Sequence, residues 1–133
     1  MRLDIGPFPS AGGQEWIAQA RLLTSLVRKG APLPFAVPPE VLDEFEEMFE
    51  GWEQAAEVEP FVWSREIDVV LLQPLMTYWF NLAQMLADHP EYQPSGSTEA
   101  RVFYRNLVAA ILAELVRQAP DEFSALQERW PPL

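Results

Sequence analysis

Carboxylates are the most abundant side chains in this sequence that could do chemistry, with 20 Asp and Glu among 133 residues. In the densest acidic run, four glutamates recur at intervals of four, three and four residues, which is the spacing of one helix face. They are Glu46, Glu50, Glu53 and Glu57. Such a face could ligate a metal ion if it pointed into a helical bundle. If it pointed to solvent, it could bind a basic partner.

The neighbouring residues favour the solvent-facing interpretation. Phe45 and Trp52 belong to an apolar stripe on the opposite side of the same expected helix, so the glutamates should face water. The only histidine, His89, stands between Asp and Pro in an expected loop and not on a helix. We therefore predict no metal ligand and no cofactor. A carboxylate-dependent metalloenzyme is the least favoured alternative.

Other catalytic constellations are missing from the sequence. It has no cysteine, and His89 is the only residue that could relay protons to a nucleophilic serine. It contains no Gly-x-Ser-x-Gly elbow, glycine-rich phosphate loop or His-Glu-x-x-His motif. Residues 95–97, Ser-Gly-Ser, could hold an anion at a helix N-terminus, but a turn followed by a helix cap explains them more simply. The sequence thus predicts no catalytic residue and a non-enzymatic protein.

The formal net charge of −11 restricts the partners that the chain could bind. Its nine Lys and Arg are scattered along the sequence, whereas nucleic acids and anionic membranes require a basic patch. We expect neither nucleic acid nor membrane as a partner. Residues 1–9 hold an acid and two prolines where a signal peptide would have its apolar run. Together with the lack of cysteine, this favours the cytoplasm.

One uncharged run, residues 69–87, approaches the roughly 20 residues that a membrane-spanning helix needs. Pro74 interrupts it, and its aromatic triplet at residues 78–80 lies in the middle, whereas membrane helices carry aromatics at their ends. The run is therefore predicted to be a buried core helix.

Hydrophobic periodicity predicts an all-α fold, a small bundle of four main helices and a short C-terminal helix in a single domain spanning residues 1–133. We expect helices at residues 14–29, from Pro38 or Pro39 to the break at Glu59, from a cap at Ser64 to residue 88, and at 98–119 and 121–130. The third helix should kink near Pro74. Expected irregular segments are a lead-in (1–13), a proline-rich connector (30–39), a loop (89–98) and a tail (131–133). No strand is expected.

Two helical faces could bind a second copy of the chain. The third expected helix carries one narrow uncharged polar stripe, which either faces solvent or is buried against a subunit or a polar ligand. Its members are Gln73, Thr77, Asn81 and Gln84. The fourth has a small-residue face with Ala110 and Ala113, which would allow close approach of another helix. Because these two helices are apolar almost all round, we predict a homodimer.

The aromatic residues Tyr78 and Trp79 follow Pro74 by about one helical turn. A kink there could open an apolar cavity, which would make the protein a small-molecule receptor. The favoured hypothesis is instead a non-enzymatic interaction module, a homodimer that binds a basic protein partner through the glutamates at 46, 50, 53 and 57.

Overall fold

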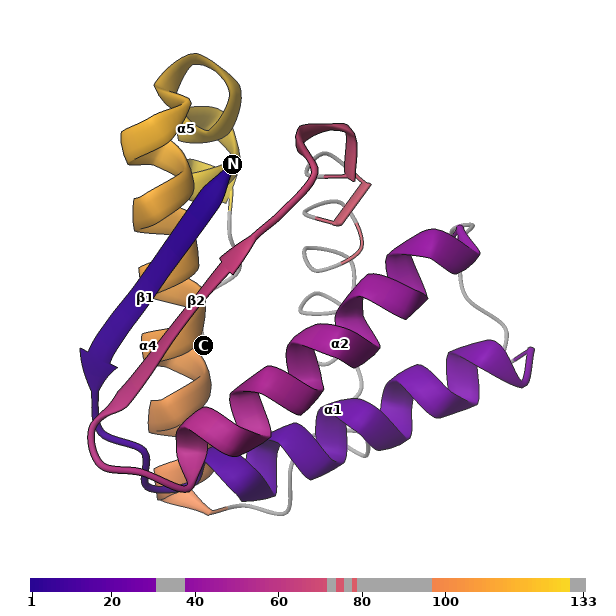
Figure 1. Ribbon diagram of the computed structural model, residues 1–133, viewed down its shortest axis with the longest axis vertical. Helices are drawn as coiled ribbons and strands as arrows, with labels where there is room; N and C mark the ends of the chain where they lie inside the picture. Colours follow the sequence, from indigo (N-terminus) through magenta and orange to yellow (C-terminus); the bar gives the residue numbers. More distant parts are fainter. Residues whose placement is uncertain (31–37, 72–73, 76–77, 79–96, 130–133) are drawn as a thin grey trace.

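The computed structural model describes residues 1–30, 38–71, 74–75, 78 and 97–129. Its elements, in chain order, are β1 (Arg2–Phe8), α1 (Gly13–Arg28), α2 (Pro39–Ala56), β2 (Phe61–Glu66), α4 (Thr98–Gln118) and α5 (Pro120–Arg129) (Figure 1). Residues 69–71, 74–75 and 78 are also helical. The expected kink near Pro74, the loop at 89–96, most of the proline-rich connector and the tail lie outside the described residues.

The prediction of an all-α bundle is wrong, because β1 and β2 pair as an antiparallel two-stranded sheet. Residues that were expected to be an irregular lead-in form β1. Ser64, expected to cap the third helix, lies inside β2 opposite Asp4. Helical structure begins further on, at residue 69, where the Asp68 carboxylate accepts a hydrogen bond from the Val70 main-chain N–H.

The two strands form because each alternates buried and exposed side chains, and neither could bury its inner face alone. Leu3 and Ile5 of β1 are buried, as are Phe61 and Trp63 of β2. The register pairs Ile5 with Trp63 and then shifts before Phe8 meets Phe61. The sheet thus contributes an aromatic and aliphatic surface to the core.

The helix predictions at residues 14–29, 98–119 and 121–130 and the start of the second helix at Pro39 are confirmed to within a residue or two. Ser97 caps α4, since its hydroxyl accepts a hydrogen bond from the Ala100 main-chain N–H at 3.3 Å. Pro39 opens α2 at a position where a missing N–H costs nothing.

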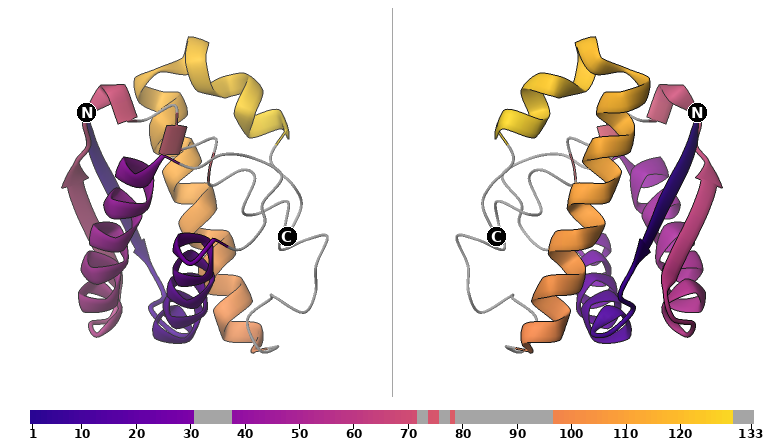
Figure 2. Two further views of the ribbon diagram at one scale, coloured as in Figure 1. Left: turned by 90° about the vertical axis from the view of Figure 1, so that its right-hand side faces the viewer. Right: turned by 90° about the vertical axis from the view of Figure 1, so that its left-hand side faces the viewer.

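The helix α4 contacts β1, α1 and α5, while β2 packs against α2 (Figure 2). Large aromatic side chains fill the space between these elements. Trp16 of α1 stacks on Tyr104 of α4 with ring centroids 4.9 Å apart. Trp52 of α2 lies edge-on to Trp63 of β2 at 5.6 Å. The first contact holds α1 against α4, and the second attaches the sheet to α2.

The β1–α1 connection approaches the start of α4 so closely that only glycine fits at residue 12. Gly12 has φ +81°, and a Cβ there would lie 2.3 Å from the Glu99 carbonyl carbon and 2.4 Å from the Ala100 nitrogen. Gly30 has a similar φ, +90°, but no atom within 4 Å of the place where a Cβ would stand. The positive φ disfavours other residues at both positions. Only at residue 12 would a Cβ also clash with backbone atoms of another element.

Gly12→Ala should therefore lower the free energy of unfolding by about 3 kcal/mol or more, because the clash with backbone atoms adds to the cost of a left-handed conformation. Gly30→Ala, the matched control, should cost about 1 kcal/mol. Chemical denaturation of both variants measures the difference. Equal destabilisation of the two would show that the close approach to α4 contributes nothing.

Candidate functional site

The helix α2 has two faces of opposite character. Its apolar face is buried in the core and consists of Val41, Leu42, Phe45, Met48, Phe49 and Trp52. Its other side carries seven acids and no Lys or Arg: Glu40, Asp43, Glu44, Glu46, Glu47, Glu50 and Glu53. Repulsion along such a face has to be relieved by cations from neighbouring elements.

Two of these cations come from α1, which runs antiparallel to α2. Arg28 donates hydrogen bonds to Asp43 at 2.5 Å and to Glu46 at 2.6 Å. These bonds, the one with Glu46 foremost, raise the pKa of the Arg28 guanidinium above its usual value. Arg21, two helical turns earlier, lies 2.6 Å from a carboxylate oxygen of Glu53. The two arginines therefore bind α1 to both halves of the acidic face.

The third cation comes from β2. Arg65 donates to Glu44 at 2.8 Å and also to Glu47, so it bridges two acids three residues apart on α2. Partial burial pulls the pKa of Arg65 down, but the hydrogen bonds to Glu47 and Glu44 outweigh this effect and the pKa lies above its usual value. Arg28 and Arg65 thus use the same arrangement, one guanidinium across an i, i+3 carboxylate pair.

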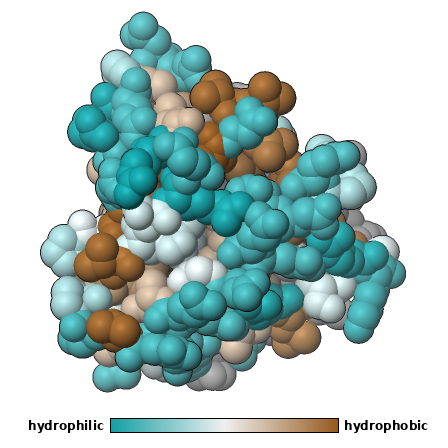
Figure 3. Space-filling view, viewed as in Figure 1, coloured by the Kyte–Doolittle hydropathy of each residue, from teal (hydrophilic) through white to brown (hydrophobic). Residues whose placement is uncertain are grey.

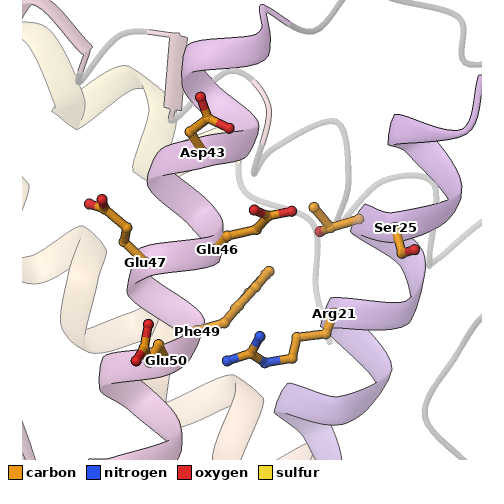
Figure 4. A pocket seen from close by; sticks show the side chains of 8 residues that line it. Arg21, Ser25, Asp43, Glu46, Glu47, Phe49 and Glu50 are labelled. Atoms are coloured by element: carbon orange, nitrogen blue, oxygen red, sulfur yellow. The ribbon is translucent and has the colours of Figure 1, made fainter.

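A pocket of about 620 Å³ lies between α1 and α2 on this acidic side. It is lined by Arg21, Thr24, Ser25, Asp43, Glu46, Glu47, Phe49 and Glu50. Figure 4 shows the Glu46 side chain reaching from α2 toward α1 and the Arg21 side chain reaching from α1 toward α2. The surface over α2 is mostly hydrophilic, with hydrophobic patches elsewhere on that face of the molecule (Figure 3). We refer to this cavity as the α1–α2 pocket.

Glu50 differs from the other acids around the α1–α2 pocket. Asp43, Glu46 and Glu47 each bind Arg28 or Arg65, whereas Glu50 is exposed and forms no ion pair with any residue in the described ranges. Seven acids against three arginines leave the α2 face negative. The pocket is therefore electronegative and contains one carboxylate that could bind a cation.

A second pocket, of about 430 Å³, lies where the start of α1, the end of α2 and the start of α4 meet. Four of its lining residues are glutamates: Glu15, Glu57, Glu59 and Glu99. Glu59 accepts a hydrogen bond from the Ser10 main-chain N–H at 2.9 Å. Because the chain's own carboxylates surround these helix N-termini, the pocket is unsuited to an anion. Residues 95–96 of the alternative anion site lie outside the described residues.

The four glutamates predicted to bind a partner are not equivalent. Glu46 and Glu50 line the α1–α2 pocket, and Glu46 is paired with Arg28. Glu53 is half-buried and lies beside Arg21. Glu57 caps the C-terminal end of α2 and lines the second pocket instead. The structure thus divides one expected face into two surfaces.

Most of the residues predicted to contact a ligand or a second subunit through the third helix lie outside the described residues: Gln73, Thr77, Trp79, Asn81 and Gln84. Tyr78 is described and is buried, with its ring edge-on to Phe45 at 5.0 Å. On α4, Ala113 is exposed and Ala110 packs partly against the core.

The three arginines that pair with acids of α2 were not identified from the sequence. A signal for two of them exists, because Arg21 and Arg28 are seven residues apart and therefore lie on one face of α1. A connector of about ten residues also allows α1 and α2 to pack as antiparallel neighbours. No comparable signal exists for Arg65, since its contact with α2 requires the unexpected strand β2.

Within the part of the chain that the structure describes, no three His, Cys, Asp or Glu side chains are grouped so as to hold a metal ion. None of the helices in the described ranges combines the length and the apolar character that crossing a membrane requires. Comparisons with protein-family models, with curated proteins and with solved structures find no match.

Burial of Tyr78 has a consequence for stability at alkaline pH. Burial raises the pKa of its phenol, and the neighbouring Thr24 hydroxyl only partly opposes this. As the pH rises past the ordinary tyrosine pKa, the unfolded chain loses this proton before the folded chain does, so the free energy of unfolding should fall. Tyr78→Phe should reduce that fall. In an absorbance titration the variant should lack one phenol that ionises at a higher pH than an ordinary tyrosine. An unchanged alkaline profile in the variant would contradict the assignment.

Proposed function

We propose that this chain is a non-enzymatic protein-interaction module whose α1–α2 pocket binds an arginine-bearing segment of a basic protein partner. The observation that carries the proposal is the pocket itself, where Glu50 has no partner among the described residues and the surrounding face has more acids than arginines. A cationic side chain entering there would meet the open Glu50 carboxylate and would compete with Arg28 for the neighbouring acids Asp43 and Glu46.

The preference for arginine follows from how α2 binds the chain's own cations. Arg28 spans Asp43 and Glu46, and Arg65 spans Glu44 and Glu47. A guanidinium presents several donors in a fixed plane and can reach two carboxylates at once, which an ammonium does less well. Glu50 lies three and four residues after Glu47 and Glu46, so the same helix spacing continues into the pocket. The cytoplasm is the compartment we propose for this binding, consistent with a chain that has no cysteine.

Glu50→Lys should weaken binding of an oligo-arginine peptide by about tenfold, because it places a positive charge at the open carboxylate. Isothermal titration calorimetry at low and high salt measures the effect, and the wild-type affinity should fall as salt rises. Glu122→Lys, on the exposed start of α5, makes the same charge change elsewhere and should have less than about a twofold effect. If both variants weaken binding equally, the affinity depends only on the net charge of the protein and the peptide does not bind in the pocket.

Arg28→Met should have the opposite effect and strengthen binding of the same peptide, because it releases Asp43 and Glu46 from their internal partner. The aliphatic part of the side chain is kept, so the packing of α1 changes little. Arg101→Met removes the same charge from an exposed position on α4 and serves as the control. An equal gain in both variants, or no gain in Arg28→Met, would argue against competition within the pocket.

A further inference from the structure

The hydrogen bonds of the two-stranded sheet determine which main-chain groups face its edges. The Met1 ammonium donates to the Ile67 carbonyl at 2.9 Å, and the Ile67 N–H donates back to the Met1 carbonyl at 2.7 Å. Bonded and non-bonded pairs alternate along an antiparallel ladder, so Asp4 and Ser64, three positions further on, form a non-bonded pair. The N–H and C=O groups of Ser64, and those of Glu66, therefore point away from β1.

The outer edge of β1 is already occupied. The side-chain amide of Gln118, on α4, donates a hydrogen bond to the Arg2 carbonyl at 2.6 Å. The helix α4 also packs against β1, and the register of β1 shifts between Ile5 and Phe8. Covering and irregular pairing are both ways in which proteins prevent a further strand from adding to an edge.

The outer edge of β2 lacks this protection. Ser64 and Glu66 are exposed, and no residue in the described ranges forms a hydrogen bond with their outward main-chain groups. β2 contains no proline, and in both views of Figure 2 it lies at the margin of the molecule. Unpaired main-chain donors and acceptors along such an edge are the groups to which an extended peptide binds.

A strand added to this edge would lie about 4.8 Å from β2 and would extend the sheet across α2, since β1 packs against α4 and β2 against α2. Arg65 shows what an inward-facing side chain meets there, because it binds Glu44 and Glu47 of α2. Inward-facing side chains of the next strand would lie further across the same acidic face. Glu47 points away from α1 and also lines the α1–α2 pocket, so the pocket adjoins this edge (Figure 4).

The charge around the edge favours a basic occupant. The acidic face of α2 has seven acids against three arginines. A second copy of this chain would bring its own acidic α2 and a net charge of −11 to the same place, and repulsion would oppose it. An extended segment with a basic residue at every second position would instead direct all its cations toward α2, because alternate side chains of a strand face the same way.

We propose that the basic partner segment binds as a third strand on the outer edge of β2, with its alternate basic side chains directed at the acidic face of α2 and into the α1–α2 pocket. Ser64 and Glu66 contribute main-chain donors and acceptors, and Glu50 contributes the open carboxylate. This inference rests on the function proposed above and specifies how the partner is held.

A peptide of about seven residues in which Arg and Thr alternate tests the main-chain pairing, because threonine favours extended structure. In an added strand the amides of one residue type face β2 and those of the other face solvent. Two versions are compared by calorimetry, one N-methylated at the arginine amides and one at the threonine amides. One version should bind about tenfold more weakly than the unmodified peptide, because its methyl groups remove hydrogen bonds, and the other should change by less than about threefold.

Which version loses affinity reports the orientation of the added strand. In an antiparallel pair the threonine amides face β2, because the residues opposite Ser64 and Glu66 have their side chains on the outer face of the sheet. In a parallel pair the arginine amides face β2 instead.

Amide hydrogen exchange of the protein provides a second measurement with an internal control. The Ser64 and Glu66 amides should exchange rapidly in the free protein and at least about tenfold more slowly when the unmodified peptide is bound. The Asp4 amide faces the opposite edge from the same residue pair, so its rate should not change.

Equal weakening by both methylated versions, or unchanged exchange at Ser64 in the bound state, would overturn strand addition. The proposed function would survive either result if Glu50→Lys still weakened binding. An unmodified peptide that does not bind would overturn both proposals. A peptide-free mass of twice 15.2 kDa, with Ser64 and Glu66 already slow to exchange, would assign the edge to a second copy and also overturn this inference.

Discussion

The rest of the structure depends on α2, which has to bury its apolar face while the charge on its acidic face is offset. One face is a continuous aromatic and aliphatic surface that must be buried, and the other carries seven acids with no cation of its own. Burial of the first face requires α1 and the β1–β2 sheet to pack against it. The same neighbours supply Arg21, Arg28 and Arg65 to the second face. The same neighbours, α1 and the sheet, therefore bury the apolar face of α2 and offset part of the charge on its acidic face.

This arrangement leaves a surface with a definite chemistry. The arginines occupy the edges of the acidic face, where α1 and β2 lie, and the pocket between α1 and α2 retains Glu50 as an open carboxylate. Because the pocket walls are themselves stabilised by arginine–carboxylate bonds, a cation from a partner would compete with internal cations of the same kind. Affinity for a basic segment is then set by the balance between internal and external guanidinium groups.

The helices were predictable from the sequence because their signals are local. The stripe from Trp16 to Val27, Pro39 at the start of α2 and Ser97 at the start of α4 each determine an element without reference to the rest of the chain. The strands were not predicted, because β1 alternates over only a few residues before Gly6 and Pro7, and its partner is about sixty residues away. Ser64 resembles a helix N-cap if only its neighbours in the sequence are considered. The same non-local pairing explains why Arg65 was not identified. The sequence therefore predicted Glu46 and Glu50 of the pocket, but not the other two acids that line it or the arginines that bind them.

The most direct test of the α1–α2 pocket as a binding site is an amide chemical-shift titration of the protein with an oligo-arginine peptide. Saturable shifts concentrated around Arg21, Ser25, Glu46 and Glu50, with little change on α4 and α5, are the expected result. Shifts of equal size over all acidic surfaces, or centred on the second pocket around Glu57 and Glu99, would contradict it.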